Sequence, residues 1–226
     1  MNSTESPGGD AHAGGAYGRR MRVHRLHAVV RLAVAGAAVV AMTYQLASLH
    51  GRGIGSGNFF SFFTIQSNIL AVLALVAVAL VPGPDRGWLL DVLRTAATLY
   101  IAITGVVFAL LLAGLQEQLQ TTIPWVDDIV HRVVPAAVVL DWLIDPPRHR
   151  IGWRTGLWWL AYPVAWFAYT LIRGSVVGWY PYPFVDVSHL GYGGVAWRAA
   201  ALMVAFAVAA LALVALSRVL RLGRRA

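Results

Sequence analysis

Hydrophobic residues are concentrated in six long runs along this chain, and polar residues are concentrated in the short segments between them. The runs cover residues 27–49, 59–81, 88–115, 124–144, 153–172 and 195–216. An α-helix rises about 1.5 Å per residue, so each run is long enough to cross the roughly 30 Å hydrocarbon layer of a bilayer. The pattern therefore predicts an all-α, polytopic membrane protein, folded as a bundle of about six transmembrane helices.

The transmembrane domain is expected to cover residues 27–217, with a tail at each end. Residues 1–26 begin with a Gly-, Ala- and Ser-rich stretch that lacks apolar periodicity, which predicts a disordered cytoplasmic tail. Residues 218–226 form a short basic cytoplasmic tail. A secretory signal also places arginines before an apolar run. However, Arg31 interrupts this run, whose length exceeds the roughly 7–15 residues of such signals, so an uncleaved first span is favoured.

The composition supports membrane insertion and excludes several kinds of site. Of the 226 residues, 58% are hydrophobic and 12% are charged, a balance that a soluble domain of this length would not carry. A net charge of +8 is typical of proteins that bind nucleic acid. Here, however, the arginines lie at the ends of apolar runs, which favours a role in membrane topology, so no nucleic-acid partner is expected. The absence of cysteine excludes disulfides and zinc–thiolate sites. Abundant Ala, Gly and Arg without Lys indicate a GC-rich, bacterial genome.

The arginines also predict the orientation of the chain. Four segments on one side are rich in arginine: residues 19–25, 86–94, 148–154 and 218–225. The segments on the other side carry only Arg52, Arg173 and Arg198. Because cytoplasmic loops are enriched in Lys and Arg, we expect a multi-pass protein of the cell membrane with both termini in the cytoplasm.

The longest outer loop, residues 174–189, is rich in aromatic residues and proline. Two prolines separated by Tyr182 make the segment stiff and extended. Such a loop suits either a lid over an outer cavity or an aromatic anchor in the headgroup region, and the sequence favours neither.

A stripe of polar residues marks the second apolar run. Ser61, Thr64 and Asn68 recur at spacings of three and four, which puts them on one helix face, with Ser67 beside it. Polar residues are costly inside a membrane and are candidates for a functional site. The alternative is helix packing, since hydroxyl and amide groups form hydrogen bonds between membrane helices. Thr64 is expected about 7 Å below the outer end of this helix.

The fourth apolar run begins with two carboxylates close to a histidine. Asp127 and Asp128 precede His131 by four and three residues, so either can lie beside its imidazole on a helix. A carboxylate that fixes the histidine tautomer makes the imidazole a suitable general base. Alternatively, the aspartates cap the helix and His131 is a packing residue. His131 is expected about 10 Å deep, near the depth of Thr64, with a bend at Pro135.

Other polar residues give weaker signals. Asp127, Asp128, His131 and His189 lack the spacing of a dedicated metal motif, so neither a metal nor another cofactor is expected. Ser188 and His189 are adjacent and form a weak rival to the Thr64 site. Three further expectations concern charge: an Asp91–Arg94 ion pair, Asp141 and Asp145 paired with Arg148 or its neighbours, and Arg132 facing a lipid phosphate or an acidic partner.

Three segments together resemble a known family. They are Phe62-Phe63-Thr64-Ile65-Gln66-Ser67-Asn68, Trp125-Val126-Asp127-Asp128-Ile129-Val130-His131-Arg132-Val133-Val134-Pro135 and Tyr180-Pro181-Tyr182-Pro183-Phe184. They are similar to the bacterial Pr6Pr membrane proteins, which are related to the androgen-induced-gene and androgen-dependent TFPI-regulating proteins of animals. The resemblance implies a hydrolase of fatty acid esters of hydroxy fatty acids, with Thr64 as nucleophile and His131 as its partner. The first span and the N-terminal tail lie outside the resemblance.

The leading hypothesis is an integral membrane hydrolase of fatty-acyl esters. Thr64 is the expected nucleophile, His131 the general base, and Asp127 or Asp128 the group that orients the imidazole. Four residues are expected to contact the substrate: Ser61, Ser67, Asn68 and Tyr182, with Ser67 or Asn68 donating to the oxyanion. The expected partner is a membrane lipid or fatty-acyl ester. The alternative is a non-enzymatic lipid-binding or regulatory protein that uses the same pocket.

Overall fold

The computed structural model describes residues 9–81, 85–115 and 123–222, and all regular structure within these ranges is helical. In chain order the elements are α1 (Gly9–Gly51), α2 (Ser56–Ser61), α3 (Phe63–Leu80), α4 (Trp88–Val107), η2 (Phe108–Leu112), α5 (Pro124–Asp128), η3 (Ile129–Val133), α6 (Val134–Ile144), α7 (Trp153–Trp158), α8 (Ala161–Val177), η4 (Pro183–Val185) and α9 (Val187–Leu222). Each predicted apolar run lies in one or more of these helices. The all-α prediction is confirmed.

Four helical stretches are long and apolar enough to cross a membrane. They are His24–Gly51 within α1, Phe63–Leu80, Trp88–Leu112 and Val187–Leu222. The other two predicted spans are helical but subdivided. The run from Pro124 changes to a π-helix at η3, and the run from Trp153 is split into α7 and the 17-residue α8. Helix length and composition therefore establish four candidate spans rather than six.

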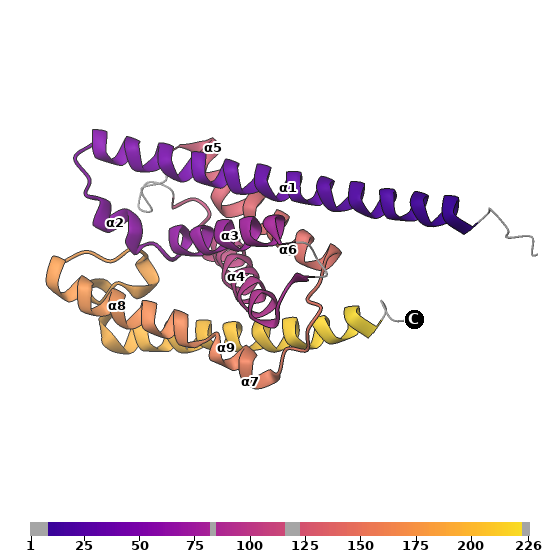
Figure 1. Ribbon diagram of the computed structural model, residues 1–226. Helices are drawn as coiled ribbons and strands as arrows, with labels where there is room; N and C mark the ends of the chain where they lie inside the picture. Colours follow the sequence, from indigo (N-terminus) through magenta and orange to yellow (C-terminus); the bar gives the residue numbers. More distant parts are fainter. Residues whose placement is uncertain (1–8, 82–84, 116–122, 223–226) are drawn as a thin grey trace, which may run out of the picture.

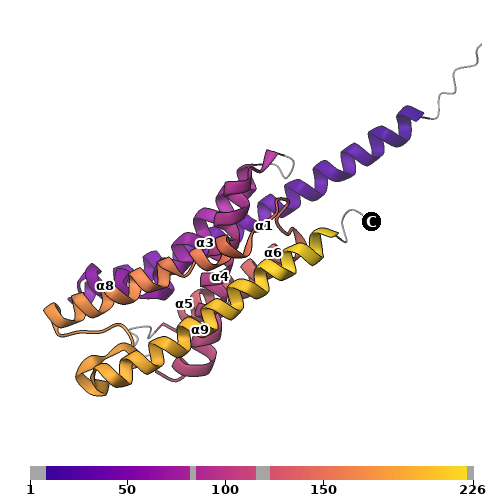
Figure 2. The same cartoon turned by 90° about the horizontal axis from the view of Figure 1, so that it is seen from below.

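The helices form a bundle in which α3, α4 and α6 lie between two outer groups (Figure 1). Helix α1 packs on α3 along one side, while α9 packs on α4 and α7 along the opposite side (Figures 1 and 2). In α1 the buried face contains Ala35, Ala38 and Ala41. Small side chains let helix backbones approach closely, which suits the close packing of α1 against α3.

Both ends of the described chain lie at the same end of the bundle. The N-terminal half of α1 extends past the other helices there, and α9 ends nearby (Figures 1 and 2). Helix α1 begins at Gly9, so residues 9–26 are helical where the sequence predicted a disordered tail. Alanine, arginine, methionine and leucine in this stretch all favour helix. Residues 1–8 and 223–226 lie outside the described ranges.

The second predicted span is broken near its start. Phe62 has φ −68° and ψ 127°, an extended conformation that separates α2 from α3. Its ring packs edge-on against Trp179 and Tyr182, so tertiary packing outweighs local helix propensity here. Ser61 therefore belongs to a different helix from Thr64 and Asn68, and the expected single polar stripe is wrong. Thr64 lies in the first turn of α3 rather than five residues inside a helix.

A buried network of charges joins α1, α4 and α6. Arg31 contacts Asp141 and Asp145, each at 2.7 Å, and its own side chain is 2% exposed. Arg94 bonds Asp141 at 2.6 Å, and Arg86 bonds Asp145 at 2.8 Å. The arginine that interrupts the first apolar run is thus neutralised inside the bundle.

The predicted ion pair between Asp91 and Arg94 is wrong. Asp91 instead accepts hydrogen bonds from the backbone N–H groups of Arg148 and His149 and contacts the His149 ring. Here Asp91 faces the segment after α6, whereas Arg94 faces Asp141 on α6.

Candidate functional site

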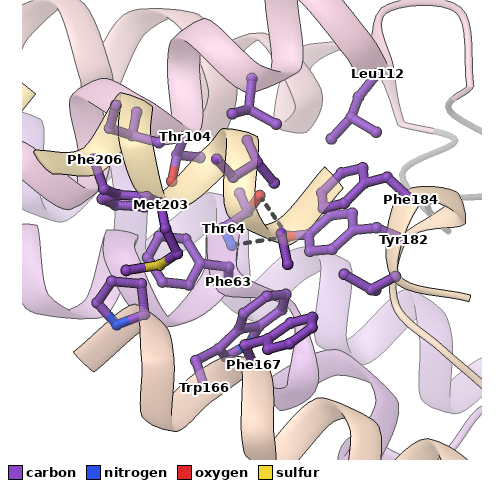
Figure 3. Close-up of a pocket in the computed structure, with 16 residues that line it drawn as sticks. Phe63, Thr64, Thr104, Leu112, Trp166, Phe167, Tyr182, Phe184, Met203 and Phe206 are labelled. Atoms are coloured by element: carbon purple, nitrogen blue, oxygen red, sulfur yellow. Dashed lines mark hydrogen bonds between the residues drawn. The ribbon is translucent and has the colours of Figure 1, made fainter. Parts of the chain in front are cut away.

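Thr64 is buried in the first turn of α3 and is hydrogen-bonded to a residue from a distant loop. The Thr64 backbone N–H donates to the Tyr182 hydroxyl at 3.1 Å, and Thr64 Oγ1 lies 3.2 Å from the same hydroxyl (Figure 3). The first N–H groups of a helix have no intrahelical acceptor, so the tyrosine oxygen caps α3. Tyr182 was predicted to contact substrate, and the structure brings it to the predicted nucleophile.

The Tyr182 ring is held tightly by other aromatic side chains. It stacks on Phe184 with ring centres 5.1 Å apart and meets Phe62 edge-on at 5.5 Å. The loop leading to it is also closely packed, because a Cβ at Gly174 would lie 2.0 Å from the Tyr180 ring. Burial raises the pKa of Tyr182 to about 12, so its phenol keeps its proton at neutral pH.

His131 faces the interior of the bundle, as predicted. Its side chain is 3% exposed, and its Nδ1 lies 2.9 Å from Asp127 Oδ1. The imidazole also stacks on Phe108 with ring centres 4.1 Å apart. Because Nδ1 is engaged by the carboxylate, Nε2 is the nitrogen left for proton transfer.

Only one of the two aspartates lies beside the imidazole. Asp127 is buried and bonded to His131, whereas Asp128 forms an ion pair with Arg132 in which both side chains are more than half exposed. The acidic partner expected for Arg132 is therefore Asp128. The residue that caps the start of α5 is Ile123, so neither aspartate is its N-cap.

The backbone around His131 widens into a π-helix. Residues Ile129–Val133 form η3, in which hydrogen bonds link residues five apart. Pro135 has no N–H to pair with the His131 carbonyl in an α-helix, and a π-helical turn removes the need for that bond. Helix α4 approaches closely here, because a Cβ at Gly105 would lie 3.0 Å from Pro135 Cβ.

Two cavities of different character meet at Thr64 and Tyr182. The smaller has a volume of about 10 Å³, room for about one water molecule, and is lined by Gln45, Phe62, Thr64, Ile65, Val130, His131 and Tyr182. The larger, of about 70 Å³, is almost entirely apolar, and among its lining residues are Phe63, Ile103, Trp166, Phe184 and Phe206 (Figure 3). Thr64 thus lies between an apolar compartment and a polar one that contains His131.

Thr64 and His131 border the same small cavity but are not hydrogen-bonded to each other. The hydrogen-bond partner of the Thr64 hydroxyl is Tyr182, and that of the His131 ring is Asp127. Catalytic hydrogen bonds are often long or poorly aligned in enzymes without substrate. The structure thus brings both side chains to one cavity, with Tyr182 bonded to the hydroxyl and Asp127 to the imidazole.

The other predicted substrate contacts have partners within the protein. Ser61 bonds the Gly57 carbonyl and Tyr169, and Ser67 bonds the Thr64 carbonyl and Thr104. Neither serine lines either cavity. Their contacts match the helix-packing interpretation of the polar stripe.

Asn68 connects the two segments that carry Thr64 and His131. Its Nδ2 donates to the Thr64 carbonyl at 2.8 Å and to the Val130 carbonyl at 3.1 Å. Both amide hydrogens are therefore used, so Asn68 has none left for an oxyanion. Its position fixes the start of α3 against η3.

The remaining candidates do not assemble into a site. Ser188 and His189 both contact Asp186, and the His189 side chain is 83% exposed. Within the described ranges, no group of three or more His, Asp or Glu residues is close enough to hold a metal ion. The sequence analysis missed Gln45 and Thr104, although each is a polar residue inside an apolar run.

Fold and site define an all-helical protein with four helices suited to a membrane and a buried threonine between two cavities. Comparison of the chain with protein-family models, with characterised proteins and with solved structures finds no match. The functional argument therefore depends on the geometry around Thr64.

Proposed function

We propose that this protein is an integral membrane hydrolase of fatty-acyl esters, with Thr64 as nucleophile and His131 as general base. One observation carries the proposal: Thr64 lines both an apolar cavity and a one-water cavity that His131 also lines. An ester hydrolase needs these two environments on either side of its nucleophile, one for the acyl chain and one for proton transfer and water. The resemblance of the Thr64 and His131 segments to the Pr6Pr proteins supports the same roles.

In the proposed reaction, Thr64 Oγ1 attacks the ester carbonyl carbon and loses its proton to His131 Nε2. A threonine hydroxyl is a weak nucleophile without an adjacent base. The protonated His131 then gives this proton to the departing alcohol, which leaves an acyl ester on Thr64. Water in the small cavity, activated by His131, hydrolyses that ester and restores the threonine.

Asp127 is proposed as the residue that orients the base. Its contact with Nδ1 at 2.9 Å holds the imidazole with Nε2 directed away from the carboxylate. A buried carboxylate in this position also stabilises the imidazolium that forms during the reaction. Asp128 is 53% exposed and paired with Arg132, so the structure offers it no comparable role.

The acyl chain is proposed to extend from the larger cavity toward the membrane. At about 70 Å³ this cavity is far smaller than the roughly 300 Å³ at which ligand pockets begin, so a long chain cannot fit inside it. A second apolar groove of about 450 Å³ shares Leu112, Phe184 and Leu202 with it. The shared side chains make the groove the natural route for the remainder of the chain.

The membrane arrangement proposed for the chain has six crossings with both termini in the cytoplasm. The arginine distribution supports this orientation. The ends of α1 and α9 lie at the same end of the bundle, as an even number of crossings requires (Figure 1).

A lipid-binding or regulatory role without hydrolysis is the competing function. It is favoured by the hydrogen bonding of Thr64 to Tyr182 rather than to His131. An apolar cavity that accepts an acyl chain serves either role. The two functions differ in whether Thr64 forms a covalent bond.

A fluorophosphonate probe distinguishes these functions on membranes that contain the protein. We expect covalent labelling of the wild type and its loss in Thr64→Ala. Thr98→Ala is the matched control, because Thr98 is also buried and bonds only a carbonyl of its own helix, that of Arg94. Equal labelling of Thr64→Ala and the wild type, at matched expression, would exclude Thr64 as the nucleophile. No labelling of the wild type would favour the lipid-binding function.

A further inference from the structure

Tyr182 provides the hydroxyl group that touches the proposed nucleophile. It is 4% exposed, comes from the loop between α8 and α9, and reaches the first turn of α3. Its oxygen lies 3.1 Å from Thr64 N and 3.2 Å from Thr64 Oγ1. When Oγ1 bonds to the carbonyl carbon of an ester, the carbonyl oxygen will therefore also lie close to the Tyr182 hydroxyl.

The hydrogen bonds of Tyr182 limit where its proton can point. The phenol oxygen accepts a hydrogen bond from the Thr64 backbone N–H, because an N–H group can only donate. Either hydroxyl can donate in the contact between Tyr182 and Thr64 Oγ1. In the arrangement that suits the reaction, the phenol donates to Oγ1 and the Thr64 hydrogen is available to His131. The positive end of the α3 dipole also lies at this oxygen, which makes the phenol a stronger donor.

We propose that the Tyr182 hydroxyl donates a hydrogen bond to the substrate's carbonyl oxygen as Thr64 attacks the carbonyl carbon. The inference deepens the proposed function and rests on it. As the bond from Oγ1 to carbon forms, the carbonyl π electrons move to oxygen and the Thr64 proton moves to His131. The resulting oxyanion accepts the Tyr182 hydrogen in place of Oγ1. When the oxyanion collapses, the bond to the alcohol oxygen breaks and the alcohol leaves with the His131 proton.

Three other side-chain donors near Thr64 are already committed. Both Asn68 amide hydrogens bond backbone carbonyls, and Ser67 donates within the protein. Thr104 donates to the Tyr100 carbonyl. Tyr182 differs from these because its hydroxyl contacts the reacting oxygen itself. Its ring is fixed by Phe184 and Phe62, so the donor is held in place before the reaction.

The test compares Tyr182→Phe with Tyr100→Phe in the full-length protein. Tyr100 is a matched control because it is also a buried phenol with one hydrogen bond, to the Trp159 carbonyl, and it lines neither cavity at Thr64. With a long-chain p-nitrophenyl ester, we expect Tyr182→Phe to lower kcat about 100-fold and to change KM little. Tyr100→Phe should keep kcat within about twofold of the wild type, by the same principle.

A pair of ligands separates this role from a structural one. A long-chain trifluoromethyl ketone adds to Thr64 to give an oxyanion, whereas the corresponding methyl ketone binds without reaction. Tyr182→Phe should weaken binding of the trifluoromethyl ketone about 100-fold and should change binding of the methyl ketone little. Equal weakening of both ligands would mean that Tyr182 only shapes the cavity, and would overturn the inference. If Tyr182→Phe does not fold, 3-fluorotyrosine at this position retains the ring and hydroxyl, and it should change the affinity for the trifluoromethyl ketone alone.

The outcomes also separate this inference from the proposed function. If Thr64→Ala is inactive and Tyr182→Phe retains the wild-type kcat, only the role of Tyr182 is wrong. If Thr64→Ala hydrolyses the ester as fast as the wild type, or the wild type does not hydrolyse it, both proposals are wrong.

Discussion

At the scale of single residues, the site depends on which atoms are brought into contact. The sequence indicated Thr64 and His131 because polar groups are costly inside apolar segments, and Tyr182 because it lies in the aromatic outer loop. It left Asp127 and Asp128 equivalent, since positions three and four apart on a helix both adjoin the histidine. The structure separates them: Asp127 is buried against His131, while Asp128 is exposed beside Arg132. The widening of the backbone at η3, which helps set these directions, has no direct signal in the sequence.

This separation predicts different effects for two similar substitutions. Asp127→Asn removes the carboxylate charge beside His131, so we expect kcat for ester hydrolysis to fall at least about 100-fold, because asparagine does not hold the reactive tautomer. Asp128→Asn changes only an exposed ion pair, and kcat should remain within about twofold of the wild type. Steady-state kinetics on both purified variants provide the measurement. A larger loss in Asp128→Asn would place the orienting role there.

At the scale of helices, the apolar runs predicted where helices occur but not where they break or how they pair. The break at Phe62 follows from its packing against Trp179 and Tyr182, residues more than a hundred positions away. Likewise, Asp141 and Asp145 were expected near Arg148 or its neighbours, whereas the network joins them to Arg31 on α1 and to two further arginines. Such partners are determined by tertiary packing, which local sequence patterns do not contain.

The charge network should make α1 depend on Arg31. In Arg31→Met, Asp141 and Asp145 remain paired with Arg94 and Arg86. We therefore expect the free energy of unfolding to decrease by about 3 kcal/mol, the lower end of the range for breaking a buried ion pair. Arg132→Met, which breaks an exposed pair, should cost less than about 1 kcal/mol. Unfolding in detergent measures both. Equal effects would show that the Arg31 network contributes little to stability.

Asp145 adds a pH dependence to the stability of this network. Burial alone raises its pKa, but hydrogen bonds from Arg86 and Arg31 outweigh burial and hold the pKa well below its ordinary value. A carboxyl with a lowered folded-state pKa stabilises the fold above its unfolded pKa of about 4, and this contribution is lost as the pH falls below it. The contribution of Asp145 to the unfolding temperature should therefore be nearly constant from pH 8 to 5. As the pH is lowered below about 4, the unfolding temperature should decrease. In Arg31→Met the acid-dependent part of the fall should be smaller.

At the scale of the whole molecule, the sequence predicted an all-helical membrane protein, and the structure contains four helices suited to spanning. The count of six remains a prediction because η3 divides one run and α8 has only 17 residues. The start of α1 and the end of α9 lie at the same end of the bundle, which is compatible with the arginine distribution (Figure 1). Tyr182, Phe184 and Val185, from the segment between α8 and α9, line the larger cavity at Thr64, and the choice between a lid and an aromatic anchor stays open.

The orientation can be tested with single cysteines, since the native chain has none. We expect Ser56→Cys and Ser188→Cys to react with a membrane-impermeant thiol reagent added outside intact cells, because both lie in segments assigned to the outer face. Gln118→Cys, outside the described ranges, should behave in the same way. Arg218→Cys, at an exposed position near the C-terminal end of α9, should react only after the cells are opened. The reverse pattern would invert the proposed orientation.

The most direct test of the central claim is hydrolysis of a long-chain fatty-acyl ester by Thr64→Ala, His131→Ala and the double variant. If the two residues act as one nucleophile–base unit, each single substitution should abolish most of the activity, and the double variant should be little worse than either one. Thr64→Ser should retain part of the activity, because it keeps the hydroxyl. Full activity in Thr64→Ala, with folding and expression matched to the wild type, would contradict the account and leave lipid binding as the function of the site.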